Sequence, residues 1–209
     1  MVYRFRKFWA NSIRQSWPAY LMVLLIFIAG LTAGAIGVHK LEVSQAQELG
    51  AYLDRFMRQA GMIEVDQVKA LKTALYNDIA VILAIYLLGL TIVGIPLILG
   101  IVFARGFALG FTVAFLTGEK IAGGPALAFA AVLPPNILLI PALLMGGVAS
   151  LSFALLLVKR FNNSKVLVWP SFIAYSSLML IVAVCSAAAS LIEVYFTPFL
   201  IKVAANFIF

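Results

Sequence analysis

Long apolar runs separated by short polar stretches dominate the hydropathy pattern of this chain. They cover about residues 18–38, 79–118, 126–158 and 166–192. A helix needs about 20 consecutive apolar residues to cross a bilayer, so the first and last runs each predict one span. The second run is long enough for two short spans, and the third exceeds one straight span. The runs are continuous rather than alternating, which favours a helical bundle over a barrel.

Basic residues flank two of these runs and orient the bundle. Four precede the first run: Arg4, Arg6, Lys7 and Arg14. Three more, Lys159, Arg160 and Lys165, follow the third run. Because basic loops stay in the cytoplasm, we predict an all-α integral membrane bundle of about five spans. Its N-terminus is then cytoplasmic and its C-terminus extracytoplasmic, and residues 1–209 form a single membrane domain. The last apolar stretch, residues 197–209, is short and is expected at the interface.

The one substantial polar stretch lies between the first two runs, at residues 39–77. Four apolar residues in it recur at helical spacing: Leu49, Leu53, Phe56 and Met57. A second helical pattern follows Gly61 and can continue directly into the next span. We expect an amphipathic helical hairpin outside the cytoplasm. Its apolar faces either pack on the bundle or the lipid interface, or form a docking surface for a partner protein.

The composition also indicates an integral membrane protein, and the distribution of charge bears on which partners it binds. Hydrophobic residues make up 64% of the chain and charged residues 11%, whereas soluble domains are about half apolar and about a quarter charged. The net charge of +7 is concentrated in the two membrane-flanking clusters, so no nucleic-acid partner is implied. The first run is longer than the core of a signal peptide, so a retained membrane anchor is favoured. Cys185 stands alone and excludes an intrachain disulfide or a cysteine-based metal cluster.

Helix-breaking and polar residues interrupt the central runs. The residues that we expect to form a polar structural centre are Gly94, Pro96, Arg105, Gly106, Pro134, Asn136 and Pro141. Proline removes a backbone donor, and irregular backbone at membrane depth needs protein or trapped water to satisfy it. We therefore expect broken or re-entrant helices that face each other, with Arg105 bound to carbonyls freed by the prolines. The alternative is a transport site at discontinuous helices.

The position of Arg105 depends on where the second span turns. If the chain reverses at Gly94–Pro96, Arg105 lies inside the third span. If the second span continues to about Val102, Arg105 lies at the cytoplasmic face. Both readings agree with the hydropathy pattern.

Catalytic or cofactor-binding constellations are not evident in the sequence. It contains no HExxH, GxSxG or P-loop motif, so neither an enzyme nor a cofactor is expected. His39 and Glu42 are weak candidates for a metal site. Asp78 and Glu193 fall near predicted membrane ends, where solvation is the expected state.

Two pairs of glycines have the spacing that allows helices to approach closely. They are Gly30 with Gly34, and Gly106 with Gly110. Either GxxxG pair could support a homodimer.

Three blocks of sequence resemble the stage II sporulation protein M family. Gly94 and Pro96 match its G-x-P step. Its F-[KR]-G-x-x-x-G-F-T-V-x-F-L block is matched by Arg105, Gly106, Gly110, Phe111, Thr112, Val113, Phe115 and Leu116, and its L-P-x-N and I-P-A elements by Leu133, Pro134, Asn136, Ile140, Pro141 and Ala142. The departures are Phe103, which is offset by one position, Ala114 in place of glycine, and Pro135 in place of the commoner glutamine.

This resemblance covers most of the chain and implies a particular role. The family is one of non-enzymatic polytopic membrane proteins of endospore-forming bacteria. Its members act in the mother-cell membrane at the sporulation septum, during engulfment of the forespore. The resemblance implies a scaffold that recruits and positions two peptidoglycan-degrading proteins, the stage II sporulation proteins D and P. The competing hypothesis is a transporter or transmembrane coupler with a polar site around Arg105 and Asn136.

Overall fold

The computed structural model describes residues 17–42, 44–45, 47–51, 67–118, 124–162 and 168–201. Within them the main elements are α2 (Trp17–His39), α4 (Gln67–Gly89), α5 (Gly94–Leu116), α6 (Gly124–Asn162), α7 (Trp169–Leu191) and a π-helical segment, η1 (Ile192–Phe196). Among the described residues, five helices are long and apolar enough to cross a membrane. The predicted all-α bundle of five apolar helices is therefore confirmed.

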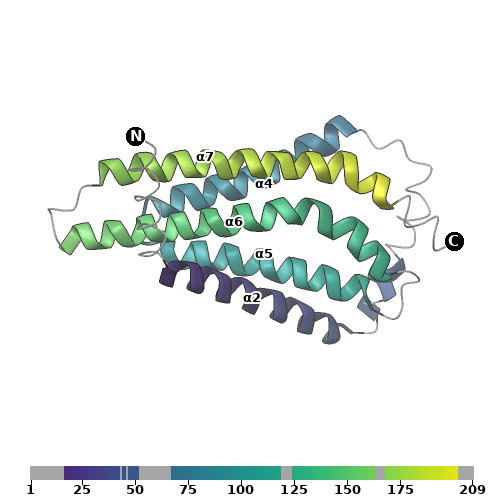
Figure 1. The fold of residues 1–209 in the computed structure, drawn as a ribbon. Helices are drawn as coiled ribbons and strands as arrows, with labels where there is room; N and C mark the ends of the chain where they lie inside the picture. Colours follow the sequence, from purple (N-terminus) through teal and green to yellow (C-terminus); the bar gives the residue numbers. More distant parts are fainter. Residues whose placement is uncertain are drawn as a thin grey trace.

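The five helices lie side by side, with α6 in the middle of the bundle (Figure 1). This helix packs against all four of the others, whereas α2 packs only on α5 and α6. One buried apolar cluster joins α4, α5, α6 and α7 around Ile85, Ile98 and Tyr175. A second joins α2, α5 and α6 around Val23 and Val102. Many large apolar side chains on the outer faces are exposed, as expected for helices surrounded by lipid.

The turn between α4 and α5 decides the position of Arg105. The chain reverses immediately before Gly94, whose amide donates to the Thr91 hydroxyl over 3.1 Å. A Cβ atom on Gly94 would collide with the Leu88 carbonyl, so the tight turn requires glycine. Pro96 falls in the first turn of α5, where a missing N–H is tolerated. Arg105 therefore lies in the middle of the third apolar helix, as the first of the two readings predicts.

The prolines of α6 bend the helix without breaking it. This helix runs for 39 residues and contains Pro134, Pro135 and Pro141. Its axis changes direction in its N-terminal third, as Figure 1 shows. A proline in a helix interior removes a hydrogen bond and displaces the preceding turn, which produces a kink. The expected interruption or re-entrant segment is therefore not observed here.

The two GxxxG pairs pack against each other within one chain. A Cβ atom on Gly30 or Gly34 would collide with backbone of Phe103 or Phe107 in α5. A Cβ atom on Gly106 or Gly110 would likewise meet backbone of α2. These glycines let α2 and α5 approach at backbone distance. Both glycine faces are thus occupied by packing within the chain, and the homodimer stays a prediction.

The structure sets the boundaries of two predicted segments. The second apolar pattern of the external stretch, which includes Leu71, belongs to α4, because this helix begins at Gln67. At the other end, helical structure continues from α7 through η1 to Ile201. The first residues of the predicted interfacial stretch 197–209 are thus part of the last apolar helix. Of the predicted partner-binding residues, Leu49 is half-buried, and Leu53, Phe56 and Met57 lie outside the described residues.

An aromatic and hydroxyl cluster closes the C-terminal end of α4. The Tyr175 hydroxyl donates to the Tyr86 carbonyl over 2.9 Å and lies 2.8 Å from the Ser150 hydroxyl. The Tyr175 ring also stacks on Phe153, with a centroid separation of 4.8 Å. Because α4 ends at Gly89, the Tyr86 carbonyl has no i+4 donor within the helix. A side chain from α7 therefore supplies the missing hydrogen bond.

Replacing Tyr175 with phenylalanine should reduce stability by about 1–2 kcal/mol, because the partly buried Tyr86 carbonyl would lose its donor. The free energy of unfolding in detergent measures the effect. Tyr76→Phe is the matched control, since the Tyr76 side chain is exposed. Equal stability of the two variants would show that the hydroxyl of Tyr175 contributes nothing.

Candidate functional site

A salt bridge joins the middle of α4 to the middle of α5. Arg105 Nη2 lies 2.9 Å from Asp78 Oδ1, and the Asp78 side chain is only 5% exposed. A charge at bilayer depth costs about 2.5–3.5 kcal/mol on insertion scales, and an uncompensated partner costs more. The pair explains how an apolar helix can retain Arg105. The expectation that Arg105 binds carbonyls freed by the prolines is replaced by this ion pair.

A third helix completes the coordination of Asp78. The Ser190 hydroxyl of α7 donates to Asp78 Oδ2 over 2.9 Å, and the Ser186 carbonyl lies 3.2 Å from the same hydroxyl. Ser186 and Ser190 are both fully buried. Asp78 thus ties α4, α5 and α7 together through one carboxylate. We call Asp78, Arg105, Ser190 and Glu193 the charged centre.

Glu193, the fourth member, comes from η1. It lies close enough to Asp78 and Arg105 to interact electrostatically with both. In the described part of the chain its carboxylate has no hydrogen bond and no salt bridge. Glu193 is instead exposed to a cavity that it lines together with Arg105.

This polar cavity has a volume of about 210 Å³ and lies mainly between α5, α6 and η1. Its polar side chains are Arg105, Thr112, Asn136 and Glu193. Pro135 and Ala131 also line it, so the bent part of α6 faces Arg105. The structure therefore brings Arg105 and Asn136, from the two interrupted runs, to one cavity.

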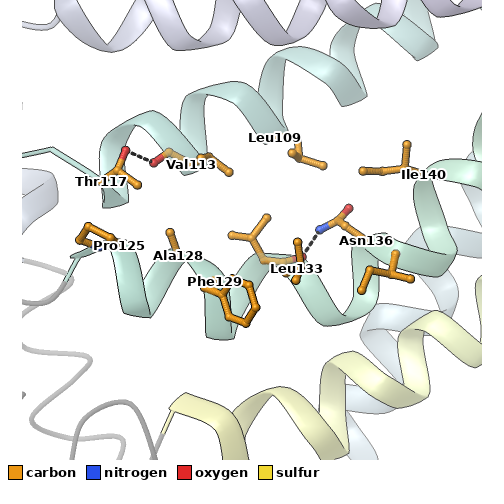
Figure 2. A pocket seen from close by; sticks show the side chains of 11 residues that line it. Leu109, Val113, Thr117, Pro125, Ala128, Phe129, Leu133, Asn136 and Ile140 are labelled. Carbon is orange, nitrogen blue, oxygen red and sulfur yellow. Dashed lines mark hydrogen bonds between the residues drawn. The ribbon is translucent and has the colours of Figure 1, made fainter. Parts of the chain in front are cut away.

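An apolar groove adjoins the polar cavity. It has a volume of about 390 Å³, and Leu109, Val132, Asn136 and Ile140 line both spaces. In Figure 2 the groove runs between α5, with Leu109 and Val113, and α6, with Phe129 and Leu133. Phe129 is 65% exposed, so the groove opens towards the surroundings of the bundle.

Asn136 lies where the groove and the polar cavity meet. Its amide nitrogen donates to the Val132 carbonyl over 2.7 Å, as the dashed line in Figure 2 shows. The amide oxygen points away from α6, towards the gap between Leu109 and Ile140. Asn136 therefore supports the bent helix with one end of its amide and presents an acceptor with the other.

The other predicted centre residues serve packing and turns. Gly94 and Pro96 begin α5, and Gly106 lies against α2. Pro141 is exposed on α6. None of these residues lines the polar cavity. These residues therefore shape the backbone and its packing and do not form part of the polar cavity.

Sequence reasoning missed Asp78, Ser190 and Glu193. It placed both acids near membrane ends, which is wrong for Asp78, because α4 begins at Gln67 and Asp78 is its midpoint. The sequence feature that points to Asp78 is Arg105. A fixed charge in an apolar helix requires a partner, and few acids are available in the other apolar segments.

A metal site at the weak candidates gains no support from the arrangement. His39 and Glu42 are both exposed, near the C-terminal end of α2. The described residues contain no group of three or more histidine, cysteine, aspartate or glutamate side chains suited to hold a metal ion.

The fold and the charged centre define a multi-pass helical membrane protein built around an internal ion pair. The sequence model of the family described as stage II sporulation protein M matches residues 23–198. The chain belongs to this family, which confirms the resemblance seen in its sequence. No curated protein and no solved structure matches the chain.

Proposed function

We propose that this protein is a non-enzymatic membrane scaffold that recruits and positions peptidoglycan-degrading proteins during forespore engulfment. The observation that carries the proposal is the family match over residues 23–198. The proposed partners are the stage II sporulation proteins D and P, and the proposed location is the mother-cell membrane at the sporulation septum. The charged centre has the features of a structural element and is consistent with a role without catalysis.

The proposed docking surface is the segment that links α2 to α4. The C-terminal end of α2 and the N-terminal end of α4 lie at the same end of the bundle, which is also where η1 ends (Figure 1). With the N-terminus in the cytoplasm, this end faces the outside, where cell-wall-degrading partners act. Leu49 is half-buried in the described part of the segment. Leu53, Phe56 and Met57 follow it at helical spacing.

Serine substitutions at these four positions should abolish recruitment. We expect the variant to insert into the membrane normally but to lose most co-purification of the D and P proteins from sporulating cells. A matched variant, Gln47→Ser with Glu48→Ser, changes exposed polar positions of the same segment and should retain it. Unchanged co-purification by the fourfold serine variant would rule out this docking surface.

The polar cavity supports a second candidate, transport or transmembrane coupling. Arg105, Asn136 and Glu193 converge on it from α5, α6 and η1. Thr112→Cys in a Cys185→Ser background should then react with a membrane-impermeant thiol reagent. No reaction in intact cells would mean that the cavity is closed to external water, which argues against a conduit.

A further inference from the structure

The charged centre is electrically unbalanced. It holds one guanidinium, that of Arg105, and two carboxylates, those of Asp78 and Glu193. Asp78 neutralises Arg105 at 2.9 Å, which leaves Glu193 as the carboxylate without an ion-pair partner among the described residues. The Glu193 side chain is exposed to the cavity, so a cation that enters there meets a carboxylate with no ion-pair partner.

The prolines of α6 leave one backbone carbonyl beside the cavity without its usual helical donors. In a helix the Ala131 carbonyl would bind the amide of residue 135, or that of residue 134 in a tighter turn. Both positions are proline, which has no N–H. Ala131 itself lines the polar cavity. Pro134 and Pro135 thus remove both of the backbone donors that usually bind the Ala131 carbonyl.

The Asn136 amide oxygen is a second neutral acceptor. The nitrogen of this amide is already bound to the Val132 carbonyl, which fixes the oxygen on the opposite side. Asn136 also lines the cavity that contains Ala131 and Glu193. Carboxylate, amide and backbone oxygens are the ligands that hard cations prefer.

The backbone around Glu193 departs from regular α-helix. Residues Ile192–Phe196 form a π-helical turn, with Thr197 bound to the Ile192 carbonyl five residues earlier. Single π-helical turns occur frequently at functional sites. This turn begins two residues after Ser190, which binds Asp78, and it contains Glu193, which lines the cavity.

We propose that the polar cavity binds a small monovalent cation, held by the Glu193 carboxylate, the Asn136 amide oxygen and the Ala131 carbonyl. The volume of about 210 Å³ accommodates a partly hydrated metal ion or a small ammonium group. One positive charge would make the centre neutral together with Asp78 and Arg105. A multivalent metal would require more acidic or imidazole ligands than the described residues assemble. The proposed cation site could exist whether the protein recruits partners, transports a substrate or does neither.

The test is thermal unfolding of the purified full-length protein in detergent, titrated with NaCl, KCl or methylammonium chloride. N-methyl-D-glucamine chloride keeps the ionic strength constant. We expect the unfolding midpoint to rise with a saturating curve for at least one of the three cations, because a ligand of the native state stabilises it. A response to methylammonium alone would identify an organic ammonium ligand, whereas a response to Na⁺ or K⁺ would identify a metal ion.

Three variants make the test specific. Glu193→Gln should weaken the apparent affinity at least tenfold, and Asn136→Asp should strengthen it by a factor of about three or more. Glu48→Gln, which changes an exposed acid far along the chain, should leave it unchanged. Equal unfolding midpoints in all four salts would overturn the proposal and leave water as the content of the cavity. The same saturating response in Glu193→Gln would overturn it as well. If Glu193→Gln does not fold, the direction of the Asn136→Asp effect decides.

Discussion

Gly110→Val is expected to destabilise the protein by about 3 kcal/mol, the upper part of the range for overpacked sites. A Cβ atom at this position would collide with the backbone of Leu31 in α2. Backbone atoms cannot rotate out of the way as a side-chain end can, so α2 and α5 must move apart. Separation would also open the neighbouring cluster around Val23 and Val102.

The same helix provides a matched control. Gly100 also lies in α5, and a Cβ atom there would have nothing within 4 Å. Gly100→Val should therefore leave the free energy of unfolding within about 0.5 kcal/mol of the original value, as for other surface substitutions. Unfolding in detergent measures both variants. Equal stabilities would show that the close packing of α2 on α5 is not needed for folding.

Removing Asp78 is expected to have the largest effect of any single change. In Asp78→Ala the guanidinium of Arg105 would lose the carboxylate at 2.9 Å, and the Ser190 hydroxyl would lose its acceptor. Breaking a buried pair by removing one partner costs about 3–5 kcal/mol. We expect a loss of that size in the free energy of unfolding, or failure of the protein to accumulate in the membrane.

The double variant Asp78→Leu with Arg105→Leu separates the ion pair from the shape of the site. Replacement of both charges by apolar side chains of similar size is often neutral or stabilising. The double variant should therefore be more stable than either Asp78→Leu or Arg105→Leu alone. Additive losses would mean that the two side chains do not interact, and the salt bridge would then have no role in stability.

Glu193 should reduce the loss of stability that Asp78→Ala causes. If Arg105 changes partner when Asp78 is absent, Glu193 is the nearby carboxylate that can receive it. Asp78→Ala would then be more damaging in a Glu193→Gln background than alone. The comparison shows whether the second carboxylate is a reserve partner for Arg105 or acts only towards the cavity.

The hydropathy pattern was sufficient to predict the class of the protein and the number of its apolar helices. Lipid requires every backbone polar group to be satisfied within the chain, so long apolar runs have few structural options. The turn at Gly94 was one of two readings that the sequence left open, and the structure decides between them. The family blocks around Arg105 and Asn136 were recognisable because they contain unusual residues at fixed spacing.

The residues that these side chains contact could not be predicted from the sequence. The sequence places Asp78 near the end of a membrane span, whereas in the structure α4 begins eleven residues earlier, at Gln67. The two GxxxG pairs looked alike as dimer motifs, and only their positions on α2 and α5 show that they face each other. Ser190 gave no signal at all, because serines are common in this part of the chain.

Sequence alone therefore determined that the chain is a helical membrane protein with a fixed charge among its apolar runs, because transfer into lipid depends on local composition. Only the tertiary structure decided where that charge lies and what balances it. The arrangement of α4, α5, α6 and η1 brings Asp78, Arg105, Asn136 and Glu193 to one place. Coulomb interactions depend on distance in space, and packing of distant segments sets that distance.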